Sequence, residues 1–101
     1  MRDSPFRPHV CHVFVCVNRR SASDPLGGGC GDAGDAVYAG TKQLIARRGL
    51  ESRVWASRTH CLGVCPKEGA AVALSPSGRL LTDVLATETE SLMTIAMGEQ
   101  A

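Results

Sequence analysis

The sequence has no excess of charge of either sign and no long apolar run, and each absence excludes a class of function. Its 11 lysine and arginine residues are balanced by 10 aspartate and glutamate residues. A nucleic-acid-binding face needs a basic excess, so we expect no nucleic-acid partner. A membrane-spanning helix needs about 18 consecutive apolar residues. The sequence contains no such run, so we expect no insertion into a membrane.

The N-terminal residues also lack the apolar core of a secretory signal peptide. Residues 1–8 contain two arginines, an aspartate and two prolines, which predicts a flexible tail ahead of one domain at 9–101. We therefore expect a cytoplasmic, reducing location, where cysteines bind metals or act in catalysis more often than they form disulfides. The odd number of cysteines, five, agrees with this, because a closed set of disulfides needs an even number.

A Cys-x-x-Cys motif is missing as well, which argues against a thiol–disulfide enzyme. We therefore expect no catalytic activity. What the chain does contain is two pairs of cysteines in segments that read as loops. Cys16 and Cys30 bracket a Gly-rich stretch, and Cys61 and Cys65 enclose a short Leu-Gly-Val segment.

Hydrophobic periodicity and turn residues predict the order strand, loop, helix, strand, loop, hairpin, helix. The predicted elements are a strand over 9–17, a loop over 18–31, a helix over 32–48, a strand over 51–57, a loop over 60–69, a hairpin of 70–74 and 79–81, and a C-terminal helix after 87–90. This order is that of an α/β, thioredoxin-like fold. We expect a four-stranded mixed sheet, two main helices and a cluster-binding loop in place of a middle helix.

Local signals refine these elements. The first helix repeats apolar residues at helical spacing and ends before Gly49. Proline second and glycine fourth in the 75–78 segment suit a type I turn, and the 87–90 segment has the spacing of a capping box. The positions expected to face the core are Val37, Thr41, Leu44 and Ile45 in the first helix and Leu92, Ile95 and Ala96 in the last.

Four thiolates suit a [2Fe–2S] cluster, which takes two on each iron. Cys16 ends the first strand and Cys30 opens the first helix, while Cys61 and Cys65 follow the second strand. If the two strands are neighbours, both loops emerge at the same edge of the sheet, and the four sulfurs can converge. The sequence therefore predicts an iron–sulfur site on these four cysteines, and hence electron transfer.

Cys11 belongs to a rival set of four, in which it replaces Cys30. If residues 9–16 are extended, the Cα atoms of Cys11 and Cys16 lie roughly 16 Å apart on opposite faces of the strand. One small cluster cannot span that separation. We therefore interpret Cys11 as a small buried hydrophobic residue.

Glycines 27, 28, 29 and 31 crowd Cys30. Glycine lets backbone N–H groups approach an anionic centre closely, and such donors raise the reduction potential of a cluster. The start of the first helix acts in the same direction. A structural reading, in which the glycines only form turns, is compatible with this one.

Three segments in this order resemble one family. His12-Val13-Phe14-Val15-Cys16-Val17-Asn18-Arg19, Gly29-Cys30-Gly31 and Cys61-Leu62-Gly63-Val64-Cys65 are similar to the thioredoxin-like [2Fe–2S] ferredoxins of bacteria, over most of the chain from His9. The resemblance implies a thioredoxin-like fold, a cluster near the surface, one-electron transfer between protein redox partners and a homodimer. It also implies Cys16, Cys30, Cys61 and Cys65 as the ligands. The balanced charge departs from the strongly acidic composition of the family.

Other readings stay open beside this one. Four thiolates also suit a structural zinc site in an interaction module, although zinc sites more often have Cys-x2-Cys pairs. His60 is expected to be exposed or to lie near the ligands without binding metal. Trp55 is expected to pack. Arg19 and Arg20 are expected to orient a partner, to balance the charge of the cluster, or to be solvated.

Overall fold

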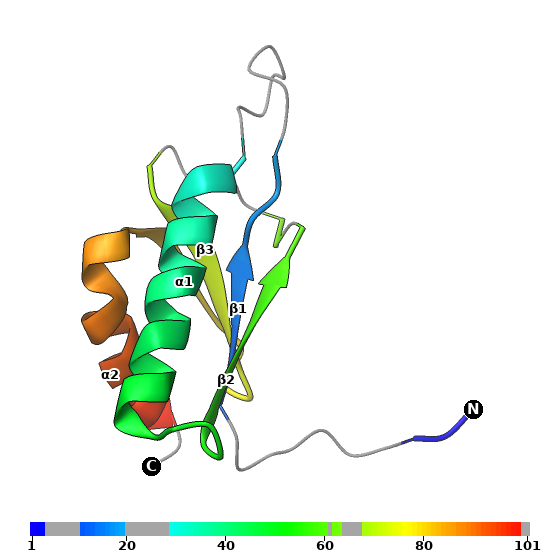
Figure 1. The fold of residues 1–101 in the computed structure, drawn as a ribbon. Helices are drawn as coiled ribbons and strands as arrows, with labels where there is room; N and C mark the ends of the chain where they lie inside the picture. Colours follow the sequence, from blue (N-terminus) through cyan, green and yellow to red (C-terminus); the bar gives the residue numbers. More distant parts are fainter. Residues whose placement is uncertain (4–10, 20–28, 61, 64–67, 100–101) are drawn as a thin grey trace.

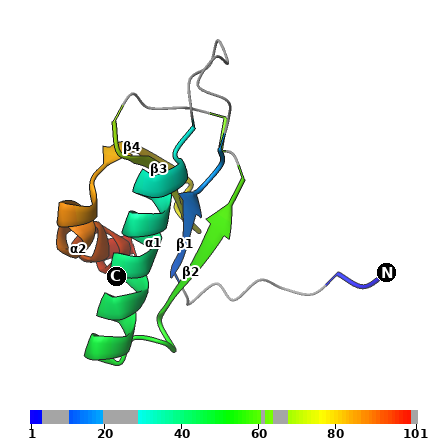
Figure 2. The same cartoon turned by 45° about the horizontal axis from the view of Figure 1, so that its top comes forward.

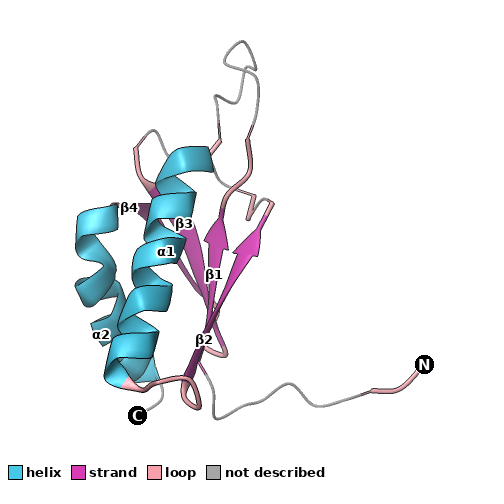
Figure 3. Ribbon diagram, viewed as in Figure 1, coloured by secondary structure: helices cyan, strands magenta, loops and turns pink. Residues whose placement is uncertain are grey.

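The computed structural model describes residues 1–3, 11–19, 29–60, 62–63 and 68–99. The element order matches the predicted one (Figure 3). The elements are β1 (Cys11–Cys16), α1 (Gly31–Arg48), β2 (Val54–Thr59), β3 (Ala70–Ser75), β4 (Arg79–Val84), a 3-10 turn (Ala86–Glu88) and α2 (Thr89–Glu99). Residues 4–10 lie outside the described part of the chain, so the domain boundary expected at residue 9 stays a prediction. Within the described ranges, no helix has the length and apolar character that crossing a membrane requires.

The four strands form one mixed sheet in the order β2-β1-β3-β4, as predicted. β1 and β2 are parallel, and the other two pairs are antiparallel. The two parallel strands lie side by side in Figure 1, and Cys16 is paired with Thr59. Their carboxyl ends therefore meet at one edge of the sheet, which is the arrangement the cysteine argument requires.

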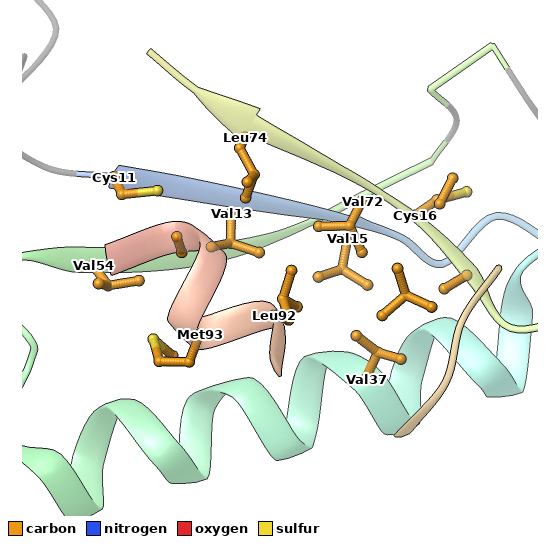
Figure 4. Packing of buried hydrophobic residues seen from close by; sticks show 14 of the residues in the cluster. Cys11, Val13, Val15, Cys16, Val37, Val54, Val72, Leu74, Leu92 and Met93 are labelled. Carbon is orange, nitrogen blue, oxygen red and sulfur yellow. The ribbon is translucent and has the colours of Figure 1, made fainter. Parts of the chain in front are cut away.

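Both helices cover the same face of the sheet (Figures 2 and 4). Alternate residues of a strand point to opposite faces, and Val13 and Val15 of β1 point toward the helices, where both are fully buried. The largest residues of this core are Leu74, Met93, Val13, Val15, Val37, Val54 and Val72. Burial of this apolar surface is the main stabilising contribution to the fold.

Helix α1 agrees closely with its prediction. Its four expected core positions are all buried. Gly49 follows the helix with φ 62°, ψ 41°, and its N–H donates to carbonyls of the last turn, as in a glycine C-cap. The helix begins at Gly31, one residue earlier than predicted, and Cys30 occupies the N-cap position.

The prediction for the second strand was wrong in its bounds. Residues 51–53 form a turn in which the N–H groups of Arg53 and Val54 both donate to the Leu50 carbonyl. The strand begins only at Val54 because that residue is the first to pair with β1, and the pairing continues to Thr59.

Two smaller expectations also need correction. The hairpin between β3 and β4 is closed by a hydrogen bond from Gly78 N–H to the Leu74 carbonyl, 2.8 Å, which spans five residues rather than the four of a type I turn. The capping interaction joins Glu88 Oε1 to the Leu85 N–H, 2.9 Å, instead of lying within 87–90. Leu92 and Ala96 of α2 are buried as predicted, and Ile95 is partly buried against the same core.

Candidate metal centre

Cys16 and Cys30 both lie at the sheet edge where β1 and β2 end. Cys16 is the last residue of β1, and Cys30 is the N-cap of α1. Their side chains are 1 % and 3 % exposed, so both sulfurs are inside the protein. Neither is part of a disulfide. Two of the four predicted ligands are therefore buried thiols in elements that meet at the expected edge.

Helix α1 approaches β1 more closely at this edge than a side chain would allow. A Cβ atom on Gly34 would lie 1.9 Å from the Cys16 carbonyl oxygen and 2.9 Å from its carbonyl carbon. Cβ atoms in proteins essentially never come within 3.0 Å of a heavy atom from a segment to which they are not bonded. Only glycine is compatible with this contact, and it fixes how close the start of α1 lies to the end of β1.

A second set of contacts joins the segments that follow Cys16 and precede Cys30. The Gly31 N–H donates to the Asn18 carbonyl, 3.0 Å, and Gly29, with φ 81°, lies against the same carbonyl. Arg19 donates to Asp32 at 2.7 Å and to Asp35.

The hydrogen bond to Asp32 is the largest cause of the raised pKa of Arg19. Arg20 lies outside the described residues, so its expected roles stay predictions. The Arg19 side chain is 57 % exposed, so it is largely solvated, as one of its expected roles required, while it pairs with Asp32 and Asp35. Its described contacts are internal and hold the start of α1 to the end of β1.

The two sulfurs meet different backbone groups. The Cys16 thiol donates to the His60 carbonyl at 3.6 Å, and Cys30 Sγ accepts a hydrogen bond from the Ala71 N–H at 3.4 Å. His60 itself is exposed, as expected, and directly precedes Cys61. The end of β1 thus touches the segment that leads into the second cysteine pair.

Cys61 and Cys65 lie outside the described residues, so their place in the site stays a prediction. Their neighbours Leu62 and Gly63 are described, and Leu62 packs against the core while Gly63 is exposed. Within the described ranges, no group of three or more metal-binding side chains gathers at one place.

Cys11 lies at the other end of β1 from Cys16 (Figure 4). It is fully buried and belongs to the hydrophobic core, as expected from the sequence. Because β1 is an unbroken strand from Cys11 to Cys16, the two side chains point to opposite faces. The extended strand on which the sequence argument against the rival set depends is therefore present, and the ligand set itself stays a prediction.

Sequence reasoning missed two residues of this site. It expected the glycines around Cys30 to direct N–H groups toward sulfur, but the Gly31 N–H is used by the Asn18 carbonyl. The donor to Cys30 is Ala71, from β3. Gly34 was not singled out either, although a glycine within a helix is a signal of close approach.

The sheet order and the two helices on one face define a thioredoxin-like fold. No protein-family model and no curated protein sequence matches the chain. Solved structures do. The crystal structure of the wild-type thioredoxin-like [2Fe–2S] ferredoxin from Aquifex aeolicus is 23% identical, with a TM-score of 0.78 over 90% of this chain and 89% of that one.

Two further structures of the Aquifex aeolicus ferredoxin agree. A cysteine-to-serine variant is 22% identical with a TM-score of 0.78, covering 90% of each chain. Another structure is 23% identical with the same TM-score, over 91% of this chain and 84% of that one. The resemblance predicted from the sequence is thus confirmed for the fold, which this chain shares over nearly its whole length.

The described donor set fits an iron–sulfur cluster. Thiolates are its usual ligands, and Cys16 and Cys30 offer two sulfurs at one sheet edge, with a backbone N–H already directed at one of them. Such N–H groups stabilise the negative charge that a cluster with four thiolates carries.

Proposed function

We propose that this protein is a small electron carrier with one [2Fe–2S] cluster, bound by Cys16, Cys30, Cys61 and Cys65. It exchanges single electrons with protein redox partners and catalyses no reaction of its own. The observation that carries the proposal is that buried Cys16 ends β1 and buried Cys30 caps α1, whose first turn packs against the end of β1. When bound, the cluster supplies the one-electron redox chemistry.

The surroundings of the cysteines support this role. Cys16 and Cys30 are shielded from water, which protects sulfur ligands and limits solvent access to the metal. His60 and Gly63, on either side of Cys61, are both exposed. We propose that a redox partner approaches the cluster from the side of these exposed residues.

Spectroscopy of the reconstituted protein tests the proposal. Anaerobic reconstitution is expected to give two irons and two labile sulfides per chain, visible charge-transfer bands, and an EPR signal only after one-electron reduction. Serine in place of any of the four cysteines is expected to abolish or distort the spectrum. The Cys11→Ser variant is the matched control, because it also changes one buried cysteine of β1 but should keep the native spectrum.

Two results would contradict the proposal. The first is a colourless protein that holds no iron or sulfide after reconstitution. The second is native protein with one zinc and no iron, which would favour the alternative of a structural zinc module. Loss of the cluster in Cys11→Ser, with Cys30→Ser unaffected, would overturn the ligand assignment alone.

A cytoplasmic location and a homodimer complete the proposal. The sheet face opposite the helices carries Trp55 and Leu80, which are 39 % and 45 % exposed, and it is the face we expect to pair two chains. Sedimentation analysis is expected to give about twice the mass of one chain for the native protein. For the Leu80→Glu variant it is expected to give the mass of a single chain. A monomer at every concentration would contradict the homodimer.

A further inference from the structure

The hydrogen bond from the Ala71 N–H to Cys30 Sγ, 3.4 Å long, links β3 to the candidate metal centre. Ala71 is fully buried, so water does not compete for this bond. Hydrogen bonds to a charged acceptor are stronger than those to a neutral one. The Ala71 bond therefore strengthens as negative charge accumulates on the Cys30 sulfur.

The pairing of the strands leaves the Ala71 N–H available for sulfur. On one side, the described pairing of β1 with β3 ends at Val15 with Val72. Ala71 is the next residue of β3 beyond this pair, in the direction of the cysteines. Its N–H thus lies where the regular ladder stops.

On the other side, the pairing of β3 with β4 is irregular at the same residue. Ala70 pairs with Val84 and Val72 pairs with Leu81, so β4 has two residues, 82 and 83, opposite Ala71. An extra residue of this kind is a β-bulge, which interrupts the ladder and is common beside functional sites. The bulge explains why a backbone donor in the middle of a sheet can serve a side chain.

We propose that the Ala71 N–H sets the reduction potential of the proposed cluster through Cys30. This inference rests on the proposed function. When a redox partner delivers one electron, the negative charge on the ligand sulfurs increases, and the N–H dipole stabilises that charge while its proton stays on nitrogen. The amino end of α1, at which Cys30 lies, acts on the same sulfur in the same direction.

The donor is a backbone group, so its removal requires a change in the backbone itself. The chain can be assembled by ligating residues 1–60 to a synthetic segment 61–101 at Cys61. The test variant carries lactic acid in place of Ala71, which replaces the N–H by an ester oxygen and keeps the methyl group. The control carries glycolic acid in place of Gly78, whose N–H donates to the Leu74 carbonyl at 2.8 Å in the hairpin turn. Each variant loses one described backbone hydrogen bond.

Midpoint potentials are measured by EPR-monitored titration on both esters and on the ligated all-amide protein. We expect the midpoint potential of the Ala71 ester to be more negative than that of the all-amide protein. The midpoint potential of the Gly78 ester should equal that of the all-amide protein. Equal potentials for the Ala71 and Gly78 esters would overturn the inference. An all-amide protein that takes up no iron or sulfide would instead overturn the proposed function.

A second measurement does not depend on the folding of the ester. Ala71 is labelled with nitrogen-15 in the all-amide protein, and its hyperfine coupling to the reduced cluster is measured by pulsed EPR, with a nitrogen-15 label at Gly78 as the control. We expect a coupling for Ala71 and none for Gly78. The same weak or absent coupling at both labels would overturn the inference.

Discussion

The two ends of β1 each carry a buried cysteine, yet they have different surroundings. Cys11 is 0 % exposed and Cys16 is 1 % exposed, so burial does not distinguish them. Cys11 belongs to the core that the helices cover, whereas Cys16 has a backbone carbonyl at its sulfur and Gly34 against its own carbonyl. The comparison teaches that burial alone does not mark a candidate ligand. Cys16 differs from Cys11 in its place, because it lies where the two parallel strands end and the first turn of α1 meets β1.

Enlarging Gly34 should have the largest effect, because it disturbs the Cys16 end of the strand directly. In Gly34→Ala the new methyl group meets the rigid Cys16 carbonyl at 1.9 Å, so α1 must move away from β1. Overpacking of this kind costs about 3 kcal/mol or more, at the upper end of its usual range. Denaturant unfolding measures the stability, and the visible spectrum after reconstitution measures the site.

Gly98→Ala is the matched control for this prediction. Gly98 is also a helix glycine, but nothing lies within 4 Å of the position its Cβ would take. Since alanine favours a helix over glycine by about 1 kcal/mol, stability should be unchanged or slightly higher. A Gly34→Ala protein as stable as Gly98→Ala, with a native spectrum, would show that the close approach of α1 is unnecessary.

Changing the other end of β1 should affect stability but not the site. Cys11→Ser places a hydroxyl group in the hydrophobic core, which costs about 1–3 kcal/mol. The reconstituted spectrum is expected to stay native, since Cys11 is separated from Cys16 by the length of the strand. Unfolding curves and spectra recorded on the same preparation separate the two effects. A changed spectrum with unchanged stability would contradict the expectation that Cys11 serves the core and not the site.

The middle of β1 should add a pH dependence. Burial lowers the pKa of His12 from its ordinary value of 6.5, and its ring stacks on Phe14 with 4.1 Å between centroids. The unfolded chain then binds a proton more readily than the folded one. Stability from His12 is complete above pH 6.5 and is lost as the pH falls through 6.5 toward the lower folded pKa.

Unfolding of the native protein and of His12→Gln at a series of pH values measures this effect. The other titrating groups are common to both proteins, so the difference between the two curves isolates His12. We expect the native protein to lose more stability than the variant between about pH 7.5 and about pH 5.5. This range extends about one pH unit above and below the ordinary pKa of histidine. Parallel curves would mean that His12 is protonated as easily in the folded protein as in the unfolded chain, which would contradict the lowered pKa.

The smallest effect is expected from Arg19, which joins the two segments at the solvent-exposed surface. Ion pairs between exposed side chains contribute little to stability and are screened by salt. Arg19→Ala should therefore lower the melting temperature slightly at low salt, and less at high salt, with the cluster retained. A large decrease in melting temperature that does not depend on salt would contradict this prediction. It would show that the contacts with Asp32 and Asp35 contribute more to stability than exposed ion pairs do.

Much of the fold was predictable because its signals are local. The helical spacing of Val37, Thr41 and Leu44 and the glycine that ends α1 act within one segment, and both predictions are confirmed. The start of β2 was not predictable to the residue, because it depends on which residue first pairs with β1. The turn and capping details failed for a different reason, since several hydrogen-bond partners were available locally.

The sequence by itself determined the order of elements and the helical faces, because spacing and periodicity along one chain decide these. It also predicts Cys16 and Cys30, rather than Cys11, as ligands. Only the tertiary structure decided the roles of Gly34 and Ala71. Gly34 matters through a carbonyl 18 residues earlier, and Ala71 through a sulfur 41 residues earlier. Contacts between distant backbone segments depend on how the strands and helices pack. A helix glycine can signal a close approach, but the sequence does not say which carbonyl or sulfur the segment meets.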